Sequence, residues 1–328
     1  MMVHDADLES FRQLVSARMG LSFGDDKHGL LRDIFDQGLA KEGFASAGEY
    51  LRALEPLAGK PWDHLSEALT VGETYFFRQW DHFRAVGEAV LPVRIRARAH
   101  ERRLRILSAG CSSGEEAYSL AMLLTEKFPE LEDWQVELKG VDINAASLIK
   151  AARGLYSHWS LRETPPELCR RFFQPMNKDF RLDEKVRRKV TFERRNLSTP
   201  NMDLWPPAHY DFIFCRNMLM YLTPECAAGL LKRMADALVP GGFLFLGYAE
   251  SLRGQAGAFD SCQSHETLYY QSLQGKAGSL PSASVATDWV ADIQRSTDRI
   301  ALLTAQVPTA PLAPQPTYDQ LPAEPSDD

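Results

Sequence analysis

The sequence predicts an α/β protein built on a mostly parallel sheet with helices on both faces. Two observations support this. From about residue 104, short apolar runs alternate with stretches of helical periodicity, which is the pattern of strand–helix–strand units. Before that point, apolar residues recur at three- and four-residue steps, as in amphipathic helices. We therefore expect a helical N-terminal domain, residues 1–75, and an α/β domain, residues 76–272.

In the N-terminal part, glycines separate the periodic stretches, and Ser46 stands three residues before Glu49. A serine followed by glutamate at that spacing is typical of a capping box at a helix start. The positions expected to form the apolar helix faces are Leu8, Phe11, Leu14, Val15, Met19, Leu30, Leu31, Ile34, Phe35 and Leu39.

In the α/β part, the alternation can be followed segment by segment. Residues 154–190 interrupt it with aromatic side chains and a charged run, and a loop of that length is uncommon. We therefore expect a small inserted subdomain there. The strands are expected at 104–108, 136–141, 190–192, 210–215, 243–248 and 267–271, and the helices at 115–127, 145–152 and 224–238.

The C-terminal 273–328 are rich in proline among alanine, serine, threonine and glutamine. This composition predicts a mostly disordered tail. Within it, residues 285–303 carry apolar side chains at helical spacing, so a helix that docks on a partner is one interpretation.

The bulk composition excludes several function classes. The net charge of the 328 residues is −7, and non-specific nucleic-acid binding needs basic side chains, so no nucleic-acid partner is expected. The five cysteines form no CxxC pair, and the eight histidines form no ligand-spaced cluster, so neither a disulfide framework nor a metal site is expected. Apolar runs are too short for membrane insertion, and we expect a cytoplasmic protein.

A glycine-containing loop after the first strand of the α/β part is the most informative stretch. Gly110 and Gly114 flank small residues between a strand and a helix, and Asp142 ends the next strand. Glycine lets the backbone approach a ligand closely, and ligands bind at the carboxyl ends of such strands. A carboxylate at Asp142 can accept hydrogen bonds from both hydroxyls of a ribose.

Two nucleotide cofactors contain such a ribose. The GxGxxG pattern of NAD sites is absent, and Glu115 and Glu116 stand at the helix start, where they would repel a pyrophosphate. S-adenosyl-L-methionine has no phosphate and carries positive charge, so acidic residues near the loop favour it. Stabilisation of the helix by two acids in its first turn is the structural alternative.

Several motifs in order resemble the CheR family of chemotaxis receptor methyltransferases. The stretch from Thr70 to Arg78 is similar to the family's N-x-T-x-F-F-R signature, with Gly72 where asparagine is frequent. The others are SSGEEAYSLA at 112–121, ARGLY at 152–156, FERRNL at 192–197, DFIFCRNMLMY at 211–221, and LVPGGFLFLG at 238–247 followed by Glu250 and Ser251. The motifs occur in family order, and the resemblance covers roughly residues 5–272.

The resemblance implies a Rossmann-like S-adenosylmethionine-dependent methyltransferase sheet, with an antiparallel β-subdomain inserted at about 154–190. It implies methyl transfer to glutamate side chains of methyl-accepting chemoreceptors, giving glutamate 5-O-methyl esters and S-adenosyl-L-homocysteine. Arg78 and Tyr221 are the implied catalytic residues. The implied cofactor-binding residues are Gly72, Thr74, Arg78, Gly110, Glu116, Asp142, Asn196, Leu197, Arg216 and Asn217.

Other functions stay open at this stage. A protein of this fold could bind the cofactor as a regulatory signal, or methylate a different carboxylate. The cytoplasmic helices of chemoreceptors are the implied partner, with the β-subdomain as a docking module. The arginines from Arg94 to Arg105 are interpreted as a solvated helix face and linker, with a patch for acidic receptor helices as the alternative.

Overall fold

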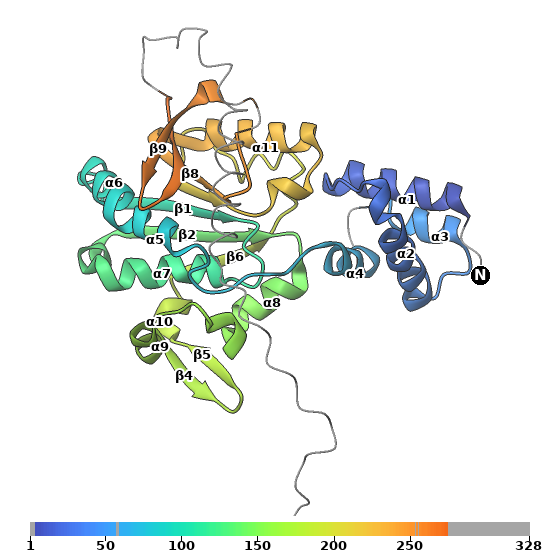
Figure 1. The fold of residues 1–328 in the computed structure, drawn as a ribbon, viewed down its shortest axis with the longest axis horizontal. Helices are drawn as coiled ribbons and strands as arrows, with labels where there is room; N and C mark the ends of the chain where they lie inside the picture. Colours follow the sequence, from blue (N-terminus) through green and yellow to red (C-terminus); the bar gives the residue numbers. More distant parts are fainter. Residues whose placement is uncertain (1–3, 57–58, 253, 255, 275–328) are drawn as a thin grey trace, which may run out of the picture. The chain divides into compact units, whose positions relative to one another are not determined.

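The computed structural model describes residues 4–56, 59–252, 254 and 256–274. A seven-stranded sheet lies at its centre, in the order β6-β2-β1-β7-β8-β10-β9 (Figure 1). The strands from β6 to β8 run parallel, and β10 pairs antiparallel with β8 and β9. The strands are β1 (Arg103–Ala109), β2 (Gln135–Asp142), β6 (Val190–Arg194), β7 (Tyr210–Cys215), β8 (Leu238–Leu246), β9 (Phe259–Ser264) and β10 (Thr267–Ser272).

The order of the strands places a crevice at one end of the sheet. From β1 the chain builds outward through β2 to β6, and then returns to place β7 on the other side of β1. The carboxyl ends of β1 and β7 therefore lie next to each other at the point where strand order reverses. Ligands of doubly wound sheets bind there. The predicted α/β fold is confirmed.

Helices cover both faces of the sheet (Figure 1). On one face, helix side chains such as Phe83 and Leu120 pack against Ile106 and Phe214 of the sheet. On the other, Leu230 packs with Ile213. All six residues of β7 are buried because they face a helix layer on either side. The helices are α5 (Trp80–Ala85), η2 (Val86–Val90), α6 (Leu91–Ala97), α7 (Glu115–Lys127), α8 (Ala145–Arg153) and α11 (Pro224–Ala237).

The N-terminal part, before α5, contains the α-helices α1 (Asp5–Met19), α2 (His28–Glu42), α3 (Ala47–Ala53) and α4 (Lys60–Leu69). Leu8, Phe11 and Phe35 lie at the centre of their apolar core. The Ser46 hydroxyl accepts a hydrogen bond from Glu49 N at 3.2 Å, so the predicted cap at the start of α3 is confirmed. None of the helices in the described ranges has the length and apolar composition needed to cross a membrane.

A second, three-stranded antiparallel sheet lies between α8 and β6, in the order β3-β5-β4. Phe173 of its β4 packs edge-on against Phe76, which belongs to the segment before α5. This sheet falls within the expected insertion, and its elements are β3 (Leu155–Ser157), η4 (His158–Leu161), α9 (Pro166–Phe172), β4 (Phe173–Met176), β5 (Asp179–Leu182) and α10 (Glu184–Arg187).

The interpretation of the arginine run as a solvated face is wrong at Arg94. Its side chain is 5% exposed and donates to Asp211 Oδ1 at 2.7 Å. Arg98 donates to the same oxygen at 2.8 Å. The two arginines tie α6 to the start of β7, whereas Arg102 and Arg103 do lie at the surface. The predicted tail helix, 285–303, lies outside the described residues.

Candidate active site

All eleven residues expected at the site line two hollows at the carboxyl ends of the strands. One hollow contains Gly72, Asp142, Asn196, Leu197 and Tyr221. The other contains Thr74, Arg78, Glu116 and Arg216. Gly110 and Asn217 line both hollows, as do Val71 and Ser112, so the two form one continuous site.

Asp142 is held by the backbone around it. Its Oδ2 accepts from Ser112 N at 2.8 Å, and its Oδ1 accepts from Asn144 N at 2.8 Å. Burial raises the pKa of this carboxyl above its usual value, while these backbone N–H groups oppose the rise. These contacts fix the carboxylate at the end of β2, where it lines the first hollow and can accept a hydroxyl group.

The loop after β1 approaches the ligand space with its backbone. Gly110 has φ +80°, and a Cβ there would lie 3.0 Å from Met218 Sδ, so only glycine fits without displacing that side chain. The neighbouring Ser112 hydroxyl is buried and has no hydrogen-bond partner among the described residues. It is a free donor and acceptor on the wall shared by both hollows.

Glu116 and Arg216 form an ion pair in the second hollow. Arg216 donates to Glu116 Oε2 at 3.2 Å, and the Ser108 hydroxyl donates to Oε1 at 2.7 Å. Burial raises the pKa of Glu116, and Arg216 opposes that rise. Arg216 also donates to the Arg78 carbonyl oxygen and to Gln79 Oε1, while its Nε has no partner within the described residues.

Arg78 stands at the end of the segment that joins α4 to α5. Its backbone is held by Arg216, and its guanidinium donates to the Glu73 carbonyl oxygen at 2.8 Å. Phe76 and Phe77 beside it are fully buried, so they anchor the segment while Arg78 reaches the hollow.

Tyr221 is placed by two loops. Its carbonyl oxygen accepts from Ser22 N at 2.8 Å, which joins it to the N-terminal helices. The loop before it is held by Glu250, whose Oε2 accepts from Asn217 N and Gly247 N, both at 2.7 Å. Asn217 has φ +56°, a conformation that this clamp supports. Glu250 was noted in sequence only as part of a motif, without a role.

The two hollows match S-adenosylmethionine chemically. Asp142 suits the ribose diol. Glu116 and the guanidinium groups of Arg78 and Arg216 suit a zwitterionic amino-acid group, because they offer both signs of charge. The first hollow also has apolar walls against which a purine ring can pack, from Met19, Leu21, Ile143, Leu197 and Leu222.

Comparison with known proteins identifies the family. The description "CheR methyltransferase, SAM binding domain" matches residues 72–268. Chemotaxis protein methyltransferase 2 of Vibrio cholerae is 31% identical over 84% of this chain and 96% of its own length. This chain belongs to the CheR methyltransferase family. It is an S-adenosylmethionine-dependent methyltransferase, and S-adenosylmethionine is its cofactor.

Two further relatives are similar to most of this chain. The chemotaxis protein methyltransferase of Vibrio parahaemolyticus is 32% identical over 82% of this chain and 98% of its own. The probable biofilm formation methyltransferase WspC of Pseudomonas aeruginosa is 32% identical over 76% of this chain and 58% of its own length. The names of these two relatives refer to two different processes, chemotaxis and biofilm formation.

Gly72 is the departure from the CheR signature. A Cβ built on it would meet only Ser112 Oγ, at 3.9 Å. An asparagine side chain therefore has room to start there. In this chain the wall at that position consists of backbone and the unpartnered Ser112 hydroxyl.

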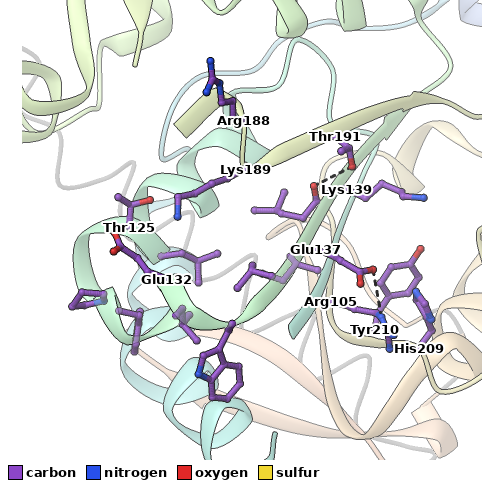
Figure 2. A pocket seen from close by; sticks show the side chains of 18 residues that line it. Arg105, Thr125, Glu132, Glu137, Lys139, Arg188, Lys189, Thr191, His209 and Tyr210 are labelled. Atoms are coloured by element: carbon purple, nitrogen blue, oxygen red, sulfur yellow. Dashed lines mark hydrogen bonds and ion pairs between the residues drawn. The ribbon is translucent and has the colours of Figure 1, made fainter. Parts of the chain in front are cut away.

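A cavity of about 390 Å³ lies away from this CheR site, around the first half of β2 (Figure 2). It is bordered by Thr125 and Lys189 on one side and by Arg105 and Glu137 on the other. None of the eleven expected residues lines it. It lies toward the amino ends of β1, β2 and β7, opposite the end where such sheets bind ligands.

We expect Asp142→Asn to weaken cofactor binding by about tenfold or more, because an amide cannot accept at both positions and a charged hydrogen-bond acceptor is lost. Titration calorimetry with S-adenosylhomocysteine measures this. Asp133→Asn is the control, since that side chain is 83% exposed. Equal affinities of the Asp142 variant and the wild type would exclude the ribose role.

Glu115 gives a pH-dependent prediction. Burial raises its pKa to about 7, against hydrogen bonds from Ser113 and Ser160. The pKa of Glu115 is 4.5 in the unfolded chain and about 7 in the folded one, so between these pH values the folded state binds more protons. This group's contribution to stability therefore falls as pH rises. Glu115→Gln should therefore gain stability relative to wild type from pH 5 to pH 8. Urea unfolding of both proteins at each pH checks this, and a pH-independent difference would contradict it.

Proposed function

We propose that this chain transfers the methyl group of S-adenosylmethionine to glutamate side-chain carboxylates of methyl-accepting chemoreceptors, forming glutamate 5-O-methyl esters. The observation that carries the proposal is the continuous site that joins Arg78 and Glu116 to Asp142 and Tyr221. The relatives' shared name, chemotaxis protein methyltransferase, supports the choice of substrate.

The chemistry asks little of the protein beyond positioning. Bound S-adenosylmethionine supplies a methyl group on a sulfonium, which is already a good leaving group. A glutamate carboxylate is ionised at neutral pH, so it needs no general base. Arg78 and Tyr221 donate hydrogen bonds to the carboxylate and orient its attacking oxygen, and orientation of this kind accounts for large rate factors.

The cofactor-binding residues are assigned by what each can reach. Asp142 accepts from the ribose, and Asn196 and Leu197 border the adenine. Glu116 and Arg216 face the amino-acid end. Backbone and side chains of the remaining residues close the walls, namely Gly72, Thr74, Gly110 and Asn217.

The small sheet is proposed to dock the receptor. Its strands β3 and β4 are both edge strands, and edge strands accept an added peptide strand. Leu155 on β3 is 38% exposed and Met176 on β4 is 41% exposed, so each edge carries an apolar side chain for a partner. Met176→Asp should weaken capture of a receptor C-terminal peptide, with Met202→Asp, 79% exposed and outside this sheet, as the control.

The proposed organisation follows from these roles. Residues 1–75 form a helical domain, residues 76–272 the methyltransferase domain with the insertion at 154–190, and residues 273–328 a tail. We propose a cytoplasmic location, because the proposed substrates are the cytoplasmic helices of receptors, and that compartment keeps cysteine thiols reduced.

Labelling with tritiated S-adenosylmethionine tests the proposal. Receptor-containing membranes incubated with the chain should gain label that alkali releases as methanol. A receptor whose candidate glutamates are changed to alanine is the control. Alkali-stable label, or cofactor binding without transfer, would contradict the proposal and favour another substrate or a regulatory role.

A further inference from the structure

Arg162, which follows η4 of the inserted segment, lies between two aromatic rings. Its guanidinium carbon is 3.7 Å from the ring centroid of Tyr75 and 4.1 Å from that of Trp159. The same group donates to the Trp159 carbonyl oxygen and to Glu73 Oε1, both at 2.7 Å. Its side chain is only 20% exposed. A planar guanidinium that both stacks and donates is a role that lysine cannot reproduce.

Glu73 links this cluster to Arg78. Its carboxylate is held by Arg162, and its carbonyl oxygen accepts from Arg78 at 2.8 Å. Arg162 therefore contacts Glu73, whose backbone carbonyl oxygen holds the Arg78 guanidinium. A change at Arg162 should therefore alter the position of the Arg78 guanidinium through Glu73.

Residues 71–75 have no regular secondary structure to hold them in place. Within them, Val71 is 63% exposed. The firm anchors lie further along, where Phe76 N donates to Ser160 O at 2.9 Å and Phe77 N to Ser119 Oγ at 2.9 Å. The Arg162 cluster thus holds the Glu73 carboxylate and the Tyr75 ring, and Glu163 adds a hydrogen bond to the Tyr75 side chain.

We propose that Arg162 is a positioning residue for methyl transfer, which acts through Glu73 on the guanidinium of Arg78. The inference rests on the proposed function for the step that it serves. It also assigns a role to the start of the inserted segment, since Arg162, stacked on Trp159, connects it to the segment that carries Thr74 and Arg78.

Arg171 offers a matched control on the same insertion. It pairs with Glu126 at 2.7 Å and lies 5.5 Å from the Phe172 ring, so it makes the same two kinds of contact. Neither partner belongs to the 71–78 segment. Arg171→Gln should therefore leave transfer unchanged.

The kinetic test compares Arg162→Gln, Arg162→Lys and Arg171→Gln on receptor membranes. We expect kcat to fall about tenfold in Arg162→Gln, with KM for S-adenosylmethionine within about twofold, because misplacing a substrate-orienting group reduces turnover. Arg162→Lys should retain only part of the wild-type kcat. Glu73→Gln should lower kcat as much as Arg162→Gln does. The double variant Arg162→Gln/Glu73→Gln should lower kcat no more than either single variant. Equal losses in kcat for the Arg162 and Arg171 variants would overturn the proposal.

Hydrogen exchange provides a readout that needs no receptor. Amides of residues 73–78 should exchange faster in Arg162→Gln than in wild type and Arg171→Gln. Unchanged exchange overturns the positioning role, whatever the substrate is. A wild-type chain that labels no receptor contradicts the proposed function, and faster exchange in Arg162→Gln would still support the link from Arg162 to Arg78.

Discussion

Replacing Arg78 with alanine is expected to lower methyl transfer by about a hundredfold, because the incoming carboxylate loses a group that orients it. The affinity for S-adenosylhomocysteine should change much less. Asp142 and its backbone donors, on which the ribose is expected to depend, do not contact Arg78. Initial rates on receptor membranes and calorimetry with the product separate the two effects.

The backbone of Arg78 limits what this variant disturbs. Arg216 holds the Arg78 carbonyl oxygen, which alanine keeps, so the ion pair with Glu116 should survive. Arg84→Ala is the control, since Arg84 is a surface arginine paired with Asp81 and Glu88 on its own stretch of helix. Transfer by Arg78→Ala at the wild-type rate would remove Arg78 from the mechanism.

The central strands were predictable because burial on both faces leaves a continuous apolar run. Tyr210–Cys215 is such a strand, and its predicted bounds are those observed. β8 was predicted at 243–248, yet it starts at Leu238 and passes through the Pro-Gly-Gly stretch with a register irregularity against β7. β9 was missed, because it is a polar edge strand that only its pairing with β10 defines.

Some residues of the candidate site were likewise predictable from sequence and others were not. Residues that end strands, such as Asp142 and Arg216, could be proposed from sequence, since the fold fixes where strand ends lie. Contacts between distant segments could not. Glu250 clamps Asn217 from 33 residues away, and Arg162 reaches Glu73 across 89. Side chains that support the site through such contacts carry no local signal of their partner.

Asp211 is the clearest case of such a contact, and its loss should be the largest change in stability. Its carboxylate is 2% exposed and accepts from Arg94, Arg98 and Arg105 N. Asp211→Ala leaves the Arg94 guanidinium buried without its counter-charge, which costs about 3–5 kcal/mol. Urea unfolding followed by circular dichroism measures the loss.

Most of this loss of stability should come from the uncompensated charge of Arg94 rather than from the absence of the ion pair itself. Asp236→Ala, which removes the exposed partner of Lys232 one helical turn away, should cost under about 0.5 kcal/mol. Arg94→Met combined with Asp211→Leu removes both charges and should recover much of the stability, because apolar residues of similar size often replace a buried pair without loss. A double variant as unstable as Asp211→Ala would instead show that the ion pair is needed to attach α6 to β7.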